Sequence, residues 1–450
     1  MKKSSSWTRR DFIAKPAALL AASQILGHSN LLMAEATTLA PTETKKILTR
    51  TLGRTGIKVP IVSMGEPASD AAGLVRRAYE LGIRHFDTAA EYQEGKNEVL
   101  LGNEIKAMGI RKEAVISTKI FVGNQWKSVD PAKVGPQVKT AFEASLKRLQ
   151  TDYLDILYLH HVEDPTVLSM EGLLQTLTDL KKQGRIRAIG VSMHNAEPIL
   201  NAVAKQGVFD VALFPFNYSM ATDKELMAAV DNAHKAGVGL VAMKTTAGNF
   251  GKASGPAAEG AGGPAPAGGA APAGGAAGGP APAGAQAGGG PEGGQGGGRE
   301  KGASGVTRTA LLKWVLHHDA ITTLISAFGN YDHIEQNVSV AYDLAYTKEE
   351  MNVLADKKVV AEMEFCHQCY QCLPTCPKGA EVPTLMRSHM YAMQYYPGTG
   401  HPHEALATIP VGRGLDACSN CDSCTASCAW TVNIPRKINQ LQAWHSSVMA

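Results

Sequence analysis

The stretch 85–102, HFDTAAEYQEGKNEVLLG, places the carboxylate of Asp87 and the phenol of Tyr92 five residues apart. The apolar residues Ile83–Phe86 just before it predict a short buried strand, so both side chains come where a strand passes into a loop. A phenol can donate a proton to a reacting group, and a charged neighbour tunes its acidity. Taken alone, the pair has a second interpretation: a loop carboxylate and a tyrosine of the core.

Two later apolar runs also end in polar residues. Lys119 ends the run VISTK, and His160 ends ILYLH. Each has an ordinary alternative, a solvated loop cation or a hydrogen-bonded core imidazole. The carboxyl ends of parallel barrel strands meet at one mouth, where reactive groups gather. In a parallel sheet these residues would therefore converge with Asp87 and Tyr92, and as a group they favour chemistry.

The elements that would position these groups alternate between short apolar runs and helical patterns. An alternating stretch with two glycines, Ile47–Pro60, predicts a hairpin ahead of them. Eight strand–helix alternations predict an α/β fold, a (β/α)8 TIM barrel, and no G-x-G-x-x-G follows the first run, which counts against a doubly wound sheet. The runs are Ile61–Met64, Ile83–Phe86, Val115–Ser117, Ile156–Leu159, Ile186–Val191, Val211–Phe214, Val238–Met243 and Thr323–Ser326, with helices predicted at Val138–Leu149, Gly172–Gln183, Lys224–Ala236 and Thr309–His317.

All eight cysteines lie after residue 365, in two runs with the same spacing, C-x2-C-x2-C-x3-C. This is the bacterial ferredoxin spacing for two [4Fe–4S] clusters, in which the fourth cysteine of each run ligates the other cluster. Four disulfides are an alternative, as is zinc, although zinc more often uses paired C-x2-C knuckles. The predicted ligands are Cys366, Cys369 and Cys372 with Cys428, and Cys418, Cys421 and Cys424 with Cys376.

The N-terminus has the composition of an export signal. Arg9-Arg10 precedes Asp11-Phe12-Ile13 and a modestly apolar stretch, and Ala34-Glu35-Ala36 offers a small-residue cleavage site. These features predict a twin-arginine signal over 1–36, engagement of the twin-arginine export machinery and a periplasmic or otherwise exported protein. A basic, frayed terminus is the alternative, and the apolar stretch is too short and polar for a stable membrane span.

The rest of the chain divides by composition. After residue 36 it carries 39 basic and 39 acidic residues, a balance that gives no electrostatic argument for nucleic acid. We expect a spacer over 37–45, the barrel over 46–360 and a cysteine domain over 361–450. Within the barrel, 249–305 holds 22 of the 46 glycines, which predicts a disordered insertion, either a tolerated surface expansion or a lid.

The barrel segment resembles the aldo-keto reductases over about 46–360. The resemblance rests on LGRTGIKVP, HFDTAAEYQEGKNEVLLG, VISTK, SLKRLQTDYLDILYLHH, LKKQGRIRAIGVS and VGLVAMK. It implies that Tyr92 is the general acid, that Lys119 lowers its pKa, that Asp87 holds Lys119, and that His160 orients the substrate oxygen. His161 is expected to point the other way.

The resemblance also implies a nicotinamide cofactor, NADP(H) or NAD(H), across the barrel mouth, and a small carbonyl or alcohol substrate. The cofactor contacts that it assigns are Ser192, Asn217, Met243, Lys244, Asn330, Gln336 and Asn337. Met193, Leu213 and Met243 depart from the family pattern, and the usual 2′-phosphate clamp is replaced by Asn330 and His333. These departures leave cofactor choice open.

The cysteine domain resembles the mainly α-helical ferredoxin type, because SHMYAMQYY between the two runs has a helical pattern. The combination resembles an aldo-keto reductase subfamily with a C-terminal ferredoxin module. It implies an exported oxidoreductase in which two [4Fe–4S] clusters exchange electrons with an unidentified redox partner. The alternative is a non-catalytic electron-transfer or scaffold protein with a degenerate barrel.

Overall fold

The computed structural model describes residues 46–67, 72–121, 130–246, 303–356, 363–395, 401–419, 421 and 423–449. The predicted signal, the spacer and residues 249–302 of the predicted insertion lie outside them. Residues 303–305, which we predicted to be the end of the insertion, instead begin helix α9, Ala303–Leu316. The apolar spacing that marks the helix starts later, and the small residues before it continue the same backbone conformation.

Eight parallel strands close into a barrel in the order β10-β3-β4-β5-β6-β7-β8-β9. Each of the eight predicted apolar runs overlaps one of them, so the predicted TIM barrel is confirmed. The predicted hairpin is also present, as β1 (Thr49–Thr51) paired antiparallel with β2 (Lys58–Pro60). The barrel strands are β3 (Val62–Pro67), β4 (His85–Asp87), β5 (Val115–Phe121), β6 (Leu154–His160), β7 (Ile186–Ser192), β8 (Val211–Pro215), β9 (Gly239–Met243) and β10 (Ile321–Phe328).

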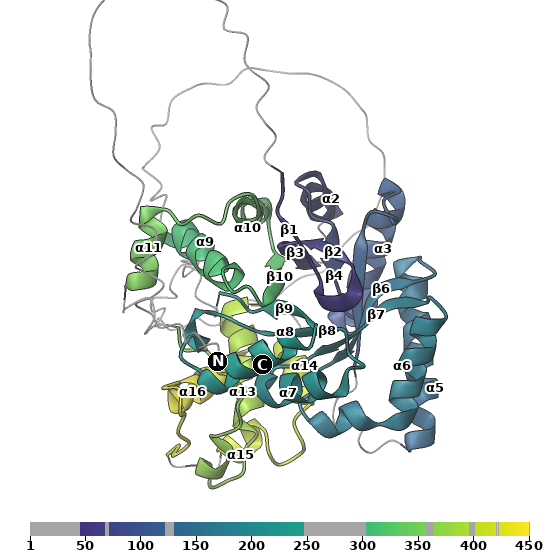
Figure 1. Cartoon of the computed structure of the whole chain (residues 1–450). Coiled ribbons are helices and arrows are strands. Elements are labelled where there is room, and N and C mark those ends of the chain that lie inside the picture. The colour runs from purple at the N-terminus through teal and green to yellow at the C-terminus, as the bar shows by residue number, and fades with distance from the viewer. Residues whose placement is uncertain are drawn as a thin grey trace, which may run out of the picture. The chain divides into compact units, whose positions relative to one another are not determined.

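Helices surround these strands, as Figure 1 shows for α2, α3, α5 and α6. Their apolar faces and the outward side chains of the strands form the largest hydrophobic cluster of the protein, as expected for a sheet whose outer face is covered by crossover helices. The helices are α2 (Ala72–Glu80), α3 (Lys96–Met108), α5 (Pro131–Leu149), α6 (Glu171–Lys182), α7 (Ala196–Gln206), α8 (Lys224–Lys235), α9, α10 (Tyr331–Tyr342) and α11 (Lys348–Ala355), with short 3-10 turns η1 (Gly53–Thr55), η2 (Tyr92–Gly95), η3 (Pro165–Ser169) and η4 (Tyr218–Met220).

The N-terminal hairpin closes one end of the barrel. Leu52, Ile57 and Val59 belong to the same buried cluster as the interior residues Ile156 and Tyr158. The interior is thus filled from this end, and the opposite end, where β4, β5 and β6 finish, is left for polar groups. Side chains alternate along a strand, so each inward residue near the hairpin determines which later residue faces the mouth.

One tight contact in the barrel interior fixes how the Tyr158 ring packs beside β7. Tyr158 is fully buried, and a Cβ added to Gly190 on the neighbouring strand would lie 2.3 Å from its ring. Glycine is therefore the residue that lets the ring lie flat against β7. Two positions further along each strand, His160 and Ser192 reach the mouth.

The C-terminal module is mainly helical, as predicted. Its small core contains residues from both cysteine runs, among them Cys372 and Cys428, together with apolar residues of the helices. The elements are η5 (Leu373–Thr375), α13 (Val382–Met390), the π-helical η6 (Tyr391–Tyr395), α14 (His401–Ala407), α15 (Leu415–Ser419) and α16 (Ile434–Met449). None of the described helices is both long enough and apolar enough to cross a membrane.

Candidate functional site

The barrel mouth brings the predicted catalytic residues together. Asp87 ends β4, Lys119 lies in β5 and His160 ends β6, while Tyr92 begins η2 after the β4 loop. The Lys119 ammonium forms a buried ion pair with the Asp87 carboxylate and lies 3.4 Å from the Tyr92 hydroxyl. The rings of Tyr92 and His160 meet edge to face with centroids 5.9 Å apart. The predicted convergence is therefore confirmed, and the catalytic roles remain predictions.

A chain of buried hydrogen bonds holds the Asp87 carboxylate. The Ser117 hydroxyl donates to Asp87 Oδ1 at 2.6 Å, and His85 Nε2 lies 3.0 Å from the same hydroxyl. On its other side His85 Nδ1 lies 2.9 Å from the hydroxyl of Ser63. Burial lowers the pKa of His85 to about 4, so this imidazole is neutral and acts as a hydrogen-bonding spacer. The Lys119 ammonium also donates a hydrogen bond to the Thr88 carbonyl at 2.7 Å, in addition to its contacts with Asp87 and Tyr92.

The sequence analysis missed Glu91. Its Oε2 lies 2.8 Å from His160 Nδ1, and its Oε1 accepts the backbone N–H of Phe121 at 3.0 Å. Burial raises the pKa of Glu91, but the hydrogen bonds from His160 and Phe121 outweigh it and leave the pKa below its usual value. Burial lowers the pKa of His160 despite this carboxylate. The only sequence signal was adjacency to Tyr92, which does not reveal where a loop side chain points.

His161 does not point away, contrary to our expectation. Its ring stacks on His160 with centroids 3.9 Å apart, and also lies parallel to His194 at 5.0 Å. The strict alternation of side chains applies only within the strand, and His161 follows the end of β6 with a positive φ of 56°. That left-handed backbone turns the ring to the same side as His160.

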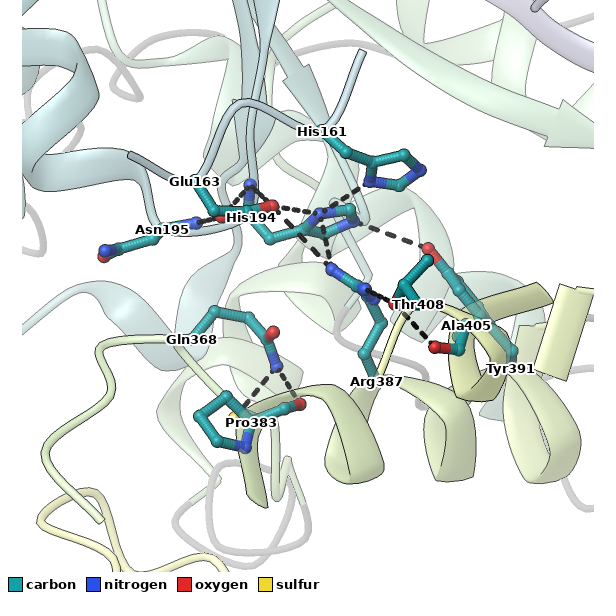
Figure 2. A network of polar contacts seen from close by, with 11 residues as sticks. His161, Glu163, His194, Asn195, Gln368, Pro383, Arg387, Tyr391, Ala405 and Thr408 are labelled. Carbon is teal, nitrogen blue, oxygen red and sulfur yellow. Dashed lines mark hydrogen bonds and ion pairs between the residues drawn. The ribbon is translucent and has the colours of Figure 1, made fainter. Parts of the chain in front are cut away.

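His161, Glu163 and His194 form a buried polar network with the module, shown in Figure 2. Arg387 of α13 lies 3.4 Å from His194 Nδ1 and 3.7 Å from Glu163, and the Tyr391 hydroxyl lies 3.4 Å from His194 Nε2. Burial raises the pKa of Glu163, yet the hydrogen bond from His194 and the nearby Arg387 bring it down to about 2. The carboxylate is therefore ionised and pairs with the module's guanidinium.

The same network offers a ligand set for a metal ion, since one atom from each of His161, Glu163 and His194 lies within 4.8 Å of the others. Two imidazoles and a carboxylate are ligands that zinc uses. However, Arg387 already neutralises Glu163, and Lys244 also contributes positive charge to this group. A divalent cation would meet repulsion from both, so we interpret the network as the attachment of the module to the barrel.

A second contact between module and barrel lies beside Tyr92. His401, the first residue of α14, places Nε2 2.9 Å from the Glu66 carboxylate at the end of β3, and Nδ1 2.9 Å from Glu404. Its ring lies 5.7 Å from the Tyr92 ring. Burial alone would lower the pKa of His401, but the hydrogen bonds to Glu404 and Glu66 raise it to about 10. His401 is therefore an imidazolium that the module contributes to the barrel mouth.

The predicted cofactor residues fall into two groups. Ser192, Asn217, Met243 and Lys244 lie at or just after the ends of β7, β8 and β9, around the same mouth, and Asn217 donates to the Lys244 carbonyl at 3.2 Å. The others belong to α10 after β10: Asn330 caps the helix, Asn337 is buried and donates to Ser326 at 2.9 Å, and Gln336 is half-buried. Nearby, Arg308 lies 3.4 Å from Asn337, a cation that the sequence analysis did not single out.

Two residues that depart from the family pattern are apolar and buried. Met193 belongs to the outer core between strands and helices. Leu213 lies in the interior of the barrel, in register with Ser192. Neither side chain can hydrogen-bond a carboxamide, and Met243 is half-buried at the end of β9.

The cysteines lie in the two crossed groups that the spacing predicts. The thiols of Cys372, Cys428 and Cys369 lie close enough to Cys366 to add to burial, which raises its pKa to about 12. Burial raises the pKa of Cys418 to about 11, and the neighbouring thiol that adds most is that of Cys376. All eight cysteines are free thiols here. Four convergent sulfur ligands are what a [4Fe–4S] cluster requires, so the residues fit such clusters.

Comparison with known proteins identifies both parts. Residues 62–260 match the model of the aldo/keto reductase family, and residues 365–433 match the model of the 4Fe-4S dicluster domain. The chain therefore contains an aldo/keto reductase domain followed by a C-terminal 4Fe-4S dicluster ferredoxin domain.

Among curated relatives, the L-galactose dehydrogenase of Arabidopsis thaliana is 30% identical over 217 residues, 45% of this chain and 66% of the relative. The methylglyoxal reductase DkgB of Salmonella typhimurium is 34% identical over 180 residues, 40% of this chain and 62% of the relative. The chain thus spans less than two thirds of the length of these relatives. A solved aldo-keto reductase from Bacillus halodurans (holo form) is 20% identical, with a TM-score of 0.48 over 71% of this chain and 96% of its own.

The His401 contact predicts a pH dependence. Its pKa of about 10 in the folded protein exceeds the value of about 6.5 for an unfolded histidine, so the pair stabilises fully below pH 6.5 and loses its contribution as the pH rises toward 10. We expect the difference in melting temperature between wild type and His401→Gln to be largest at about pH 6, just below the unfolded pKa, and to shrink as the pH rises toward 10. His403→Gln, the same change two residues away, is the control. A difference that stays constant over this range would contradict the assignment.

The crossed cysteine groups predict how many clusters each double substitution removes. Replacing Cys366 and Cys428 by Ser removes two ligands of one cluster, so about four of about eight iron atoms should remain. Replacing Cys366 and Cys376 removes one ligand from each cluster, so both should be lost or weakened. Iron and acid-labile sulfide analysis, with the spectrum of the reduced protein, measures this. The reverse pattern, in which the Cys366/Cys428 variant loses more iron than the Cys366/Cys376 variant, would argue for uncrossed ligation.

Proposed function

We propose that this protein is an exported oxidoreductase that transfers hydride between a bound nicotinamide cofactor, NADP(H) or NAD(H), and a small carbonyl or alcohol substrate. The observation that carries the proposal is the convergence of Asp87, Tyr92, Lys119 and His160 at the barrel mouth. Two relatives support the substrate class, because one is named a dehydrogenase of a sugar and the other a reductase of an aldehyde.

The chemistry of these residues follows from their surroundings. The Tyr92 hydroxyl is the proton donor for a substrate oxygen, and the Lys119 ammonium 3.4 Å away stabilises the negative charge left on the phenol. Asp87 and the Thr88 carbonyl keep that ammonium in place. The ring of His160 lies at the edge of the Tyr92 ring and is the second group that can contact the substrate oxygen.

Nicotinamide, when bound, supplies or accepts the hydride. Ser192, Asn217, Met243 and Lys244 would hold its ring end at the mouth, and Asn330, Gln336 and Asn337 on α10 would hold its adenine end. The guanidinium of Arg308 lies 3.4 Å from Asn337 and adds a positive charge on the adenine side, which favours NADP(H) over NAD(H).

The two [4Fe–4S] clusters, when bound, would carry single electrons between the protein and a redox partner. One hydride carries two electrons, so two clusters have the capacity for the electrons of one turnover. The conversion of paired electrons into single ones must take place between the nicotinamide and the clusters, and the sequence contains no flavin motif for that step.

The predicted export through the twin-arginine pathway favours a nicotinamide cofactor that stays bound to the protein. The twin-arginine pathway carries folded proteins, and Arg9-Arg10 with the small-residue site at 34–36 matches its signal. A protein folded before export can take its clusters and nucleotide with it, whereas free NADPH is not expected outside the cytoplasm. A tightly held nucleotide that is recycled through the clusters reconciles the two.

A non-catalytic electron-transfer or scaffold protein is the second candidate. The observation that favours it is the burial of Met193 and Leu213 at positions where the family holds the carboxamide with polar side chains. In that case the barrel would serve only as the docking surface for the cluster module.

Removing one hydroxyl separates the two candidates. Tyr92→Phe should lower carbonyl reduction and alcohol oxidation by about 10²- to 10⁴-fold, the usual effect of losing a general acid. Tyr158→Phe is the matched control, because its hydroxyl is buried in the barrel without a hydrogen-bond partner among the described residues. Initial rates with a panel of aldehydes and alcohols are the measurement. Equal rates in wild type and Tyr92→Phe would leave only the scaffold candidate.

The nucleotide content of the exported protein tests the recycling scheme. Purified from the exported fraction, the protein should release about one NADP(H) or NAD(H) per chain on denaturation, identified by mass spectrometry. Replacing Arg9 and Arg10 by Lys should keep the protein inside the cell with its nucleotide bound. Exported protein that contains clusters but no nucleotide would end the scheme.

A further inference from the structure

The first cysteine run is attached to the barrel right beside its first ligand. Between Cys366 and Cys369, His367 places Nδ1 3.2 Å from the carboxylate of Asp223, which caps the N-terminus of α8. The next residue, Gln368, is buried and donates a hydrogen bond to Cys366 Sγ at 3.2 Å. A cluster bound to this run would therefore be held against the barrel.

Contacts continue from this run to the barrel mouth. A small cavity between the module and the barrel is lined by Cys366, Arg387 and His194, among other residues. Arg387 lies 3.4 Å from His194 Nδ1 (Figure 2). The His194 ring is stacked on His161 at 5.0 Å, and His161 is stacked on His160 at 3.9 Å. The first cysteine of this run therefore lies on the side of the module that meets the mouth.

The second cysteine run is exposed to solvent instead. Cys424 is exposed, and so are Ser423, Thr425 and Ser427 around it. The hydrogen bonds described for Thr425 and Ser427 go to Thr375, which belongs to the module itself. Since the neighbouring side chains are small, a cluster bound to Cys424 would lie close to the protein surface.

We propose that the two cysteine groups act in series, an inner group against the barrel and an outer group on whose exposed face a one-electron carrier protein docks. The docking face consists of residues 423–427. The inner group is Cys366, Cys369, Cys372 and Cys428, and the outer group is Cys418, Cys421, Cys424 and Cys376. This inference deepens the electron-transfer part of the proposed function and rests on it.

The electron transfer balances without any change in bonds or protons. A [4Fe–4S] cluster, when bound, exchanges one electron at a time. As the inner group's cluster is oxidised by one electron, the outer group's cluster is reduced by one, and the carrier protein then takes that electron. Electrons that enter the protein follow the same order in reverse.

The composition of the docking face indicates the kind of partner. Electron transfer slows steeply with distance, so the partner must come close to the ligand Cys424. Residues 423–427, SCTAS, offer hydroxyl groups and no large apolar side chain. Such a surface suits the small, short-lived interfaces of electron carriers rather than a permanent subunit.

Electron-spin relaxation tests the order of the two groups without any turnover. Replacing Cys366 and Cys428 by Ser leaves the outer group complete, and replacing Cys376 and Cys418 leaves the inner group complete. A soluble dysprosium chelate speeds the relaxation of paramagnetic centres that lie near the surface. In the reduced proteins, we expect this effect to be several-fold larger for the outer cluster than for the inner one. If a variant does not assemble its cluster, the two signals of the wild type, separated by stepwise reduction, give the same comparison.

A bulky side chain on the docking face tests the site of electron exchange. Cytochrome c, a one-electron acceptor protein, is the probe, and its reduction by the pre-reduced protein is followed by stopped-flow absorbance. We expect Thr425→Trp to lower the second-order rate constant about tenfold, with iron content and spectrum unchanged. Thr140→Trp, the same change at an exposed position of α5, is the matched control and should leave the rate as it is. Hexaammineruthenium(III), a small acceptor, should be affected much less.

Each result has a distinct meaning. Relaxation that is equal for the two clusters, or faster for the inner one, would overturn the order. A cytochrome c rate that Thr425→Trp does not change would overturn the docking face, as would a reduced wild type that passes no electrons to cytochrome c. These measurements involve neither substrate nor nucleotide. If they turn out as expected while Tyr92→Phe changes no carbonyl or alcohol rate, the hydride transfer of the proposed function fails instead.

Discussion

The ion pair between Lys119 and Asp87 is the constraint on which the rest of the site depends. Both side chains are almost fully buried, and breaking such a pair by removing one partner costs about 3–5 kcal/mol. Burying two charges also carries a desolvation cost, which further hydrogen bonds offset: Ser117 donates to the carboxylate, and the Thr88 carbonyl accepts from the ammonium. These contacts hold an ammonium beside the Tyr92 phenol.

The cluster module adds charges of its own to this mouth. Arg387 pairs with Glu163, and His401 pairs with Glu66, so each barrel carboxylate receives one cation from the module. These contacts are buried, and they lie on either side of the catalytic group: one reaches it through His161, the other through Tyr92. The module therefore forms part of the wall of the barrel mouth, and without it Glu66 and Glu163 would lose these cationic partners.

Much of the architecture was predictable from the sequence, because it follows from local pattern. Apolar runs of the right length gave all eight strands, and the positions of Asp87, Lys119 and His160 at strand ends placed them at one mouth. The cysteine spacing likewise predicted the crossed groups. In each case the prediction depends on a repeat length or on the direction of a strand, and both can be read from a short stretch of sequence.

The contacts that the sequence analysis missed share a different physical cause. Glu91 and His161 lie just beyond the ends of strands, where alternation no longer fixes the side chain and a single left-handed residue reverses its direction. Glu66 and His401 are 335 residues apart, and nothing local in either segment indicates its partner. Such contacts depend on how the module packs on the barrel, which neither periodicity nor spacing records.

The crossing of the two cysteine groups has a consequence for the segment between them. Arg387, Tyr391 and His401 all lie between Cys376 and Cys418, within a loop whose two ends are fastened by the same inorganic anchors. In the crossed assignment Cys376 and Cys418 ligate the same cluster, so loss of that cluster would release both ends of this segment together and weaken the contacts of Arg387 and His401 with the barrel mouth. The clusters, when bound, would thus have a structural role, and their loss would change the surroundings of the Tyr92 hydroxyl.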